Sequence, residues 1–273
     1  MRSLLLHTLA WALLVSAETQ FPAHKIAGNL FYVGSVEYAA YLVATPQGHI
    51  LINSSFEESV PLIEQSVAKQ GFRFKDVKIL LTSHAHADHI AGCAAVKQST
   101  GAKVMIMRGD EDIVASGGQG DFQYEDSRFK PCAVDRVLED GDTVTLGGAT
   151  LTAVLTAGHT RGCTTWTMTA TEDGKKLLAV IIGSPNVNPG YKLVGNDKYR
   201  AIAGDFQKTF HKLKSLRADL FLGAHGQYYG LEEKYPRLGG GPNPFVDPAG
   251  YQAYVSAKEK EFLGKLEAQK QGQ

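Results

Sequence analysis

The chain of 273 residues has only three cysteines, Cys93, Cys132 and Cys163, and no excess of charge of either sign. Three cysteines form one disulfide at most, and the sequence does not choose the pair. They are also too few and too widely spaced for a zinc site closed by thiolates. The 28 basic residues balance 28 acidic ones, which excludes the basic surface of a nucleic-acid-binding protein. With 44% hydrophobic residues, the composition is that of an ordinary globular protein.

Long hydrophobic runs are also missing, with one exception at the start of the chain. Residues 4–15 are almost entirely apolar, they follow Arg2, and small residues up to Ala17 separate them from a polar stretch. This order is typical of a secretory signal peptide, and the run is too short to span a bilayer core of about 30 Å. We therefore expect a signal peptide at 1–17 and a single domain at 18–273, located in the periplasm or secreted. A short membrane anchor or a buried first helix is the alternative.

Segments with strand and helix patterns alternate along the rest of the chain. Apolar or alternating runs between turn residues predict strands, and apolar residues at helical spacing before a glycine predict helices. We expect strands at 30–34, 41–45, 49–53, 77–82, 103–107, 136–138, 143–146, 150–156, 164–169, 177–182 and 219–222. We expect helices at 57–70, 90–100, 199–215 and 247–266, a loop at 116–131 and a linker at 238–244. The two halves share this strand-then-helix order, which indicates an α/β fold of two packed sheets with helices outside.

The segment Thr82-Ser83-His84-Ala85-His86-Ala87-Asp88-His89 contains four potential metal ligands in its last six residues. The segment follows a predicted strand, so His84 and His86 lie on the same side of an extended chain. Asp88 and His89 fall in the turn into the next predicted helix. Imidazole and carboxylate are zinc ligands, and the intervening alanines add no competing group. We interpret the segment as part of a metal site, because close histidines without a metal repel one another when protonated and need partners when buried.

Two further histidines occupy matching places. His159 follows a predicted strand within Thr156-Ala157-Gly158-His159-Thr160, and His225 follows another within Leu222-Gly223-Ala224-His225-Gly226. Either one alone would more readily be structural. Together with the first segment they make five histidines and one aspartate, enough for two metal ions with three protein ligands each and open positions between them. We expect the mature chain's remaining histidines to be structural or on the surface: His24, His49 and His211.

The order His-Ala-His-Ala-Asp-His, then Gly-His-Thr, then Ala-His-Gly resembles the metal-binding signature of the metallo-β-lactamase superfamily, over residues 28–227. The resemblance implies an α/β fold, a four-layer αββα sandwich of two mixed β-sheets with outer helices. The metals would lie at one edge of the two sheets. Members of this superfamily hydrolyse β-lactams, thioesters, lactones and phosphodiesters, so the motif indicates the fold more specifically than the substrate.

Position 184 bears on the substrate. In thioesterase and lactonase members an aspartate after the corresponding strand bridges both metals, and one group of β-lactamases has a cysteine there. This chain has Gly183-Ser184-Pro185-Asn186 after the predicted strand 177–182. With His89 as an additional ligand, it is similar to the third subclass of class B β-lactamases, the His-rich, dizinc kind. An ordinary turn serine is the alternative interpretation of Ser184.

The resemblance also assigns roles to individual residues. It implies that His84, His86 and His159 hold one Zn²⁺ ion. A second Zn²⁺ would be held by Asp88, His89 and His225, with Asp88 also orienting the attacking hydroxide. The residues expected to approach a substrate carboxylate are Ser184, Asn186, Asn188 and Tyr191.

The loop at 116–124 resembles the mobile loop beside the site in this family, with Phe122 and Tyr124 as candidate apolar contacts. Some relatives carry a disulfide in the C-terminal third, which this chain lacks because no cysteine follows Cys163.

The expected function is zinc-dependent hydrolysis of the β-lactam amide bond of penicillins, cephalosporins or carbapenems, which confers antibiotic resistance. The nucleophile would be a hydroxide that two Zn²⁺ ions activate. We expect a monomer that acts on a small molecule and binds neither nucleic acid nor, after loss of the signal, a membrane. One alternative is an exported metal-dependent hydrolase of another ester or lactone on the same fold. The other is a zinc-binding module without turnover.

Overall fold

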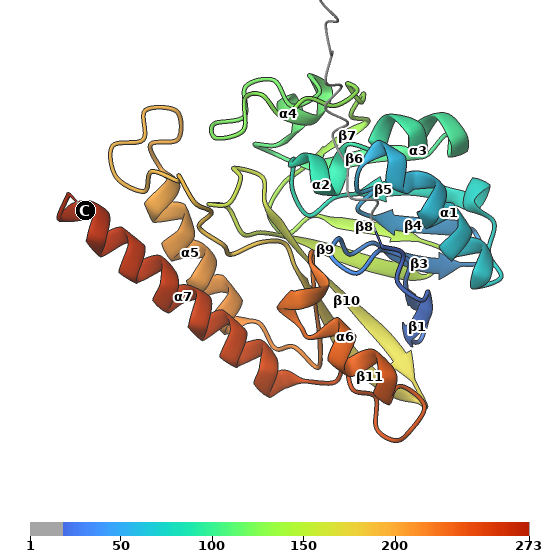
Figure 1. Ribbon diagram of the computed structural model, residues 1–273. Helices are drawn as coiled ribbons and strands as arrows, with labels where there is room; N and C mark the ends of the chain where they lie inside the picture. The colour runs from blue at the N-terminus through green and yellow to red at the C-terminus, as the bar shows by residue number, and fades with distance from the viewer. Residues whose placement is uncertain (1–18, 273) are drawn as a thin grey trace, which may run out of the picture.

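The computed structural model describes residues 19–272, which form two mixed β-sheets packed face to face between two layers of helices (Figure 1). This confirms the predicted αββα sandwich. The predicted signal peptide at 1–17 lies outside the described residues. Within residues 19–272, every helix is too short or too polar to cross a lipid bilayer.

The first sheet has seven strands in sequence order, β1 to β7. Its first four strands pair antiparallel, and β4 to β7 pair in parallel. The strands are β1 (His24–Ala27), β2 (Leu30–Tyr32), β3 (Tyr41–Thr45), β4 (Gly48–Ile52), β5 (Val77–Leu81), β6 (Lys103–Met107) and β7 (Arg136–Leu138). Parallel strands place their carboxyl ends at one edge, so the residues after β4, β5 and β6 gather there.

The second sheet has five strands in the order β12-β11-β10-β9-β8. Strands β8 to β11 pair antiparallel, and β12 joins β11 in parallel. The strands are β8 (Thr143–Leu146), β9 (Ala149–Leu155), β10 (Thr164–Glu172), β11 (Lys175–Ile182) and β12 (Leu220–Gly223). The chain leaves β9, β11 and β12 at the edge where it also leaves β5.

The first sheet is buried on both faces, which explains its continuous apolar strands. Along β4, Ile50 and Ile52 belong to the core between the sheets, whereas Leu51 packs with α1 and α3 on the outer side. The second sheet presents Trp166 and Met168 to the same central core. Side chains of alternate residues on a strand point to opposite faces, so one apolar run supplies both layers.

Helices cover the two outer faces (Figure 1). Helices α1 and α3 pack on the first sheet, and α5 and α7 lie side by side against the second, where Phe206, Phe210 and Phe262 stack with ring centroids 5.3–6.4 Å apart. The helices are α1 (Val60–Lys69), α2 (Ala87–Ile90), α3 (Cys93–Thr100), α4 (Glu111–Ala115), α5 (Ile202–Ser215), α6 (Leu231–Lys234) and α7 (Pro248–Lys270). Single 3₁₀ turns are η1 (Glu57–Ser59), η2 (Phe74–Asp76), η3 (Gly226–Tyr228) and η4 (Tyr235–Arg237).

The helix predicted at 90–100 differs from the structure, which divides this region into α2 and α3. At the break, a Cβ on Gly92 would meet the backbone oxygen of Ser54 at 2.6 Å and that of Phe56 at 2.9 Å. The chain therefore needs glycine where α3 passes close to the segment after β4. Asp88 and His89 lie in the short helix α2 rather than in a turn before a long helix.

One disulfide joins Cys93, the first residue of α3, to Cys132, which follows the predicted loop. The sequence had left this pair open. Cys163 is a buried free thiol, and burial raises its pKa to about 12. A thiol with a raised pKa forms little thiolate, so Cys163 is chemically inert.

Candidate metal centre

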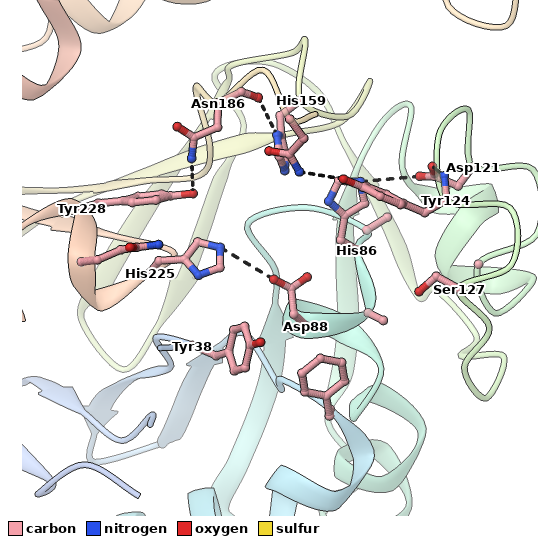
Figure 2. Close-up of a pocket in the computed structure, with 16 residues that line it drawn as sticks. Tyr38, His86, Asp88, Asp121, Tyr124, Ser127, His159, Asn186, His225 and Tyr228 are labelled. Atoms are coloured by element: carbon pink, nitrogen blue, oxygen red, sulfur yellow. Dashed lines mark hydrogen bonds and ion pairs between the residues drawn. The ribbon is translucent and has the colours of Figure 1, made fainter. Parts of the chain in front are cut away.

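Six predicted ligands from separate parts of the chain converge at one edge of the two sheets. Figure 2 shows those that line the pocket: His86, Asp88, His159 and His225. His84 and His86 follow β5, and Asp88 and His89 lie in α2. The other two come from the second sheet: His159 follows β9, and His225 follows β12.

The first three histidines surround one point. The ring of His84 lies 4.7 Å from that of His86 and 4.6 Å from that of His159, measured between centroids, and the rings of His86 and His159 are 4.7 Å apart. Each offers a ligand nitrogen, and these three nitrogens lie within 4.8 Å of one another. This spacing suits one tetrahedral zinc ion with an open fourth position.

The remaining ligands form a second group beside the first. His89 Nε2 lies 3.2 Å from His225 Nε2 and 3.2 Å from Asp88 Oδ2, and Asp88 Oδ2 is 3.7 Å from His225 Nε2. The ring of His84 is 4.3 Å from that of His89, so the two groups share a border. Two nitrogens and a carboxylate oxygen at these distances can hold a second ion.

Unpartnered nitrogen atoms provide an independent test of the fit to a metal. Nε2 of His84, Nε2 of His86 and Nδ1 of His89 are buried and have no hydrogen-bond partner among residues 19–272. Buried polar atoms are normally hydrogen-bonded, and leaving one unsatisfied costs about 1–3 kcal/mol. The unpartnered Nε2 of His84, whose ring lies 4.3–4.7 Å from three other imidazole rings, therefore fits a metal ligand, and the residues present suit zinc.

Burial favours the neutral form of four of the site histidines, which is the form that binds metal. It lowers the pKa of His84 well below its usual value, that of His86 to about 4, and those of His159 and His225 to about 3. Repulsion between neighbouring imidazoles adds to the effect of burial on these pKa values.

Asp88 remains an anion. Burial by itself raises the pKa of its carboxyl, but the neighbouring His89 and His225 outweigh burial and hold that pKa below its usual range. An ionised carboxylate accepts hydrogen bonds and ligates metal.

The segment that carries His84 and His86 is held from both sheets. Asn53 Oδ1, after β4, accepts a hydrogen bond from the Ser83 backbone N–H at 2.8 Å. Trp166 Nε1, from β10, donates to the Thr82 carbonyl at 2.9 Å. Asn53 has φ of 66°, a left-handed conformation that asparagine tolerates better than most residues. These contacts pin the segment between the sheets before any metal binds.

Asp110 ties the two ligand-bearing loops together. Its carboxylate accepts hydrogen bonds from the Ala85 N–H at 2.9 Å, the Thr160 hydroxyl at 2.7 Å and the Gly162 N–H at 2.8 Å. Ala85 stands between two ligand histidines, and Thr160 follows a third. Asp110 is 1% exposed, and burial raises its pKa to about 6 despite the three donors. Sequence reasoning missed this residue, although it follows the parallel strand β6 at the edge where site residues gather.

Replacing Asp110 with alanine is expected to lower the free energy of unfolding by about 2 kcal/mol at pH 7, because three buried donors lose their acceptor. Asp110→Asn keeps one acceptor oxygen and should cost less. Because the pKa of Asp110 in the folded protein is above its usual value, the folded state binds more protons between about pH 4 and pH 6. The contribution of Asp110 to stability therefore falls as pH rises through that window. Urea unfolding of wild type and both variants at pH 4, 5.5 and 7 measures these effects, and equal stability of Asp110→Ala and wild type would contradict this role.

The predicted substrate residues divide into two pairs. Asn186 and Asn188, after β11, line the pocket above the metal ligands. Ser184 and Tyr191 are buried behind that lining, 1% and 2% exposed. Tyr191 donates to the His159 carbonyl at 2.8 Å, so it supports a ligand loop. Contact of these four residues with a substrate stays a prediction.

The pocket has a volume of about 470 Å³, within the range of small-molecule sites. Of the two predicted loop contacts, Tyr124 lines it, whereas Phe122 is buried against Tyr191 and Tyr199. Sequence reasoning missed three aromatic lining residues, because their positions depend on other elements: Tyr38, Phe56 and Tyr228.

Tyr228 links the groups after β11 to His225. Its hydroxyl lies 3.2 Å from Ser184 Oγ and accepts from Asn186 Nδ2 at 2.6 Å, and its ring is 4.9 Å from that of His225 (Figure 2). The Asn186 carbonyl in turn lies 2.8 Å from His159 Nδ1, which donates to it. A continuous set of contacts therefore joins ligands of both groups.

The fold and its site are similar to those of solved metallo-β-lactamases. FEZ-1, a metallo-β-lactamase from Legionella gormanii, is 50% identical, with a TM-score of 0.91 over 93% of this chain and 98% of that one. BJP-1, a subclass B3 metallo-β-lactamase of Bradyrhizobium japonicum, is 35% identical, with a TM-score of 0.88 over 93% of this chain and 97% of that one.

Curated relatives are more distant. A probable metallo-hydrolase of Burkholderia pseudomallei is 29% identical over 161 residues, 56% of this chain and 53% of that protein. A hydroxyacylglutathione hydrolase of Hyphomonas neptunium is 34% identical over 80 residues, 29% of this chain and 25% of that protein. The chain thus spans about half, or less, of the length of these relatives. The model of the metallo-beta-lactamase superfamily matches residues 36–170. With this match and half of its residues identical over nearly the whole of FEZ-1, the chain belongs to the metallo-β-lactamase superfamily.

Proposed function

We propose that this protein hydrolyses the amide bond of β-lactam antibiotics with two bound Zn²⁺ ions. The observation that carries the proposal is the convergence of five histidines and Asp88 beneath an open pocket. In this chain the position after β11 is occupied by Ser184 rather than by a residue with a carboxylate. The likeness to solved class B3 β-lactamases over more than nine-tenths of the chain supports the same substrate class.

Each of the two groups of candidate ligands would hold one zinc ion. His84, His86 and His159 would hold one, and Asp88, His89 and His225 the other. Bound zinc supplies Lewis acidity, which polarises a carbonyl and lowers the pKa of a coordinated water to about 7. The histidines contribute by staying neutral, since burial lowers their pKa values below the physiological range.

The carboxylate of Asp88 is a hydrogen-bond acceptor in the wall of the pocket. Its carboxylate is ionised and lines the cavity between the two halves of the site. From there it can accept a hydrogen bond from an attacking water and orient one lone pair of that water toward a substrate carbonyl. In this role Asp88 is a catalytic residue as well as a ligand.

The wall after β11 is suited to the carboxylate that β-lactams carry. Asn186 and Asn188 each have a side-chain amide at the pocket, and each amide has two N–H donors. One donor of Asn188 goes to the Tyr124 hydroxyl at 2.9 Å, and one of Asn186 goes to Tyr228 at 2.6 Å, so both amides are held at the pocket wall. Tyr38 and Phe56 lie across the pocket and offer an apolar surface.

The proposed location is the periplasm, with residues 1–17 as signal peptide and the following residues as one catalytic domain. A β-lactamase there meets its substrate before the antibiotic reaches its target. The disulfide Cys93–Cys132 agrees with an oxidising compartment.

Thioester hydrolysis is the second candidate, because some curated relatives are named hydroxyacylglutathione hydrolases. The alignments to them cover 44% of this chain or less. Ser184, whose hydroxyl lies 3.2 Å from that of Tyr228, disfavours this candidate because the position lacks a metal-bridging carboxylate.

Turnover of nitrocefin and a carbapenem by the purified protein tests the proposal against thioester and lactone substrates. We expect β-lactam turnover to exceed turnover of the others, to disappear with a chelator, and to return on addition of zinc. Without zinc no hydroxide is available at neutral pH, because the pKa of free water is about 15.7. Turnover that survives thorough chelation, or a preference for the thioester, would overturn the proposal.

A further inference from the structure

Two of the three histidines in the first group have an oxygen atom behind the ring. His84 Nδ1 lies 3.3 Å from Ser83 Oγ, and His159 Nδ1 lies 2.8 Å from the Asn186 carbonyl oxygen. In both histidines Nδ1 has the oxygen partner, so Nε2 is the nitrogen that remains for a metal ion between the three rings. An oxygen partner on the far nitrogen fixes the tautomer and the orientation of a metal-binding imidazole.

The third histidine, His86, has no such hydrogen bond among residues 19–272, and its Nε2 is buried and unsatisfied. The acidic group facing that nitrogen is Asp121, whose Oδ2 lies 3.7 Å away (Figure 2). This is an ion-pair distance, somewhat longer than a hydrogen bond. Since Nε2 faces Asp121, Nδ1 of His86 is the nitrogen left for a metal.

Asp121 is built into the loop in a way that aims one oxygen at His86. Its Oδ1 accepts from the backbone N–H groups of Gln123 at 2.8 Å and Tyr124 at 2.6 Å, which fixes the carboxylate on the loop. Its Oδ2 is left for His86. The residue is only 5% exposed, and a buried carboxylate needs such a partner.

We propose that Asp121 is the positioning residue of His86, holding its Nε2–H so that Nδ1 binds the first zinc ion. Ligating histidines usually donate their second N–H to a carboxylate, a backbone carbonyl or water, and loss of that partner typically weakens metal binding by about 10–100-fold. The proposal depends on zinc binding at the three histidines but not on the identity of the substrate.

This contact connects metal binding to the wall of the pocket. Tyr124 follows Asp121 by three residues, and its ring lies 4.9 Å from that of His86. Its hydroxyl accepts from Asn188 Nδ2, on the opposite wall. A His86 ring that is fixed by Asp121 therefore also fixes the aromatic side chain that closes this side of the pocket.

The test is zinc affinity in Asp121→Asn, measured on the full protein by competition with a chromophoric chelator. Asparagine keeps an oxygen for the two loop N–H groups but turns an amide donor toward His86, where an acceptor is needed. We expect one zinc ion to bind about 10–100-fold more weakly, the visible spectrum of the cobalt-loaded protein to shift, and the melting temperature of the metal-free protein to stay unchanged.

Asp126→Asn is the matched control, because it removes the same charge from an exposed position in the same loop. It should leave zinc affinity and the cobalt spectrum as in wild type. Wild-type affinity and spectrum in Asp121→Asn would overturn the proposal.

A crystal structure of the zinc-loaded wild-type protein gives a second test that needs no variant. It should show Nδ1 of His86 at the metal and Nε2 at hydrogen-bond distance from Asp121, and Nε2 at the metal would refute the proposal. A wild-type protein that takes up no zinc at all would instead remove the metal site, and with it the proposed function.

Discussion

Replacing His159 with alanine is expected to strip zinc from the three-histidine group and to reduce β-lactam turnover below detection. The loss should exceed the roughly 100-fold decrease that follows removal of an outer partner of a metal ligand, because a direct ligand disappears. The ring of His159 lies within 4.7 Å of both other rings of the group, so the variant keeps only two of its three imidazoles. Metal analysis after dialysis and β-lactam turnover measure the two effects.

His211→Ala is the matched control for this variant. His211 lies exposed on α5, away from the pocket, and its replacement should leave zinc content and turnover unchanged. Melting of the metal-free proteins separates a loss of ligation from a loss of fold. Full zinc content together with wild-type turnover in His159→Ala would contradict the assignment of this ligand.

Removing the disulfide with Cys93→Ala and Cys132→Ala is expected to lower the free energy of unfolding by about 4 kcal/mol. The bond closes a loop with a sequence separation of 39, and a crosslink of that length restricts the unfolded chain by roughly this amount. Alanine avoids leaving a hydroxyl at two buried positions, 0% and 2% exposed. Urea unfolding followed by tryptophan fluorescence measures the change.

A reductant provides the control for the disulfide. It should destabilise the wild-type protein and leave the double variant unaffected, because Cys163 is unpaired in both. The crosslink also anchors the end of the loop that carries Asp121 and Tyr124, so its loss should weaken zinc binding along with stability. Equal unfolding curves for wild type and double variant would contradict the prediction.

The sheets could be predicted because strand patterns are local. The apolar run 49–53 arises from burial on both faces, and β4 covers Gly48–Ile52. Strand β1 was missed because it is only four residues long and carries an exposed lysine, Lys25. Helices α4 and α6 were missed because five and four residues are too few to show a helical period.

The convergence of the six candidate ligands could also be predicted, because four of them lie within six consecutive residues and the other two follow strands. The supporting residues could not. Asn53, Asp110 and Trp166 act through backbone groups that are 25–84 positions away in the chain. No local pattern marks a polar residue whose partner is a distant N–H or carbonyl group.

The amino-acid sequence by itself determined the order of strands and helices and the chemical nature of the candidate metal ligands. Both depend on residue type and short spacing, because alternation and turn residues act within a few positions. Only the tertiary structure decided which two cysteines pair, which polar side chains line the pocket, and which carboxylates hold the ligand loops. Those outcomes depend on which segments come together at the common edge of the two sheets, and this is decided by the packing of the whole chain.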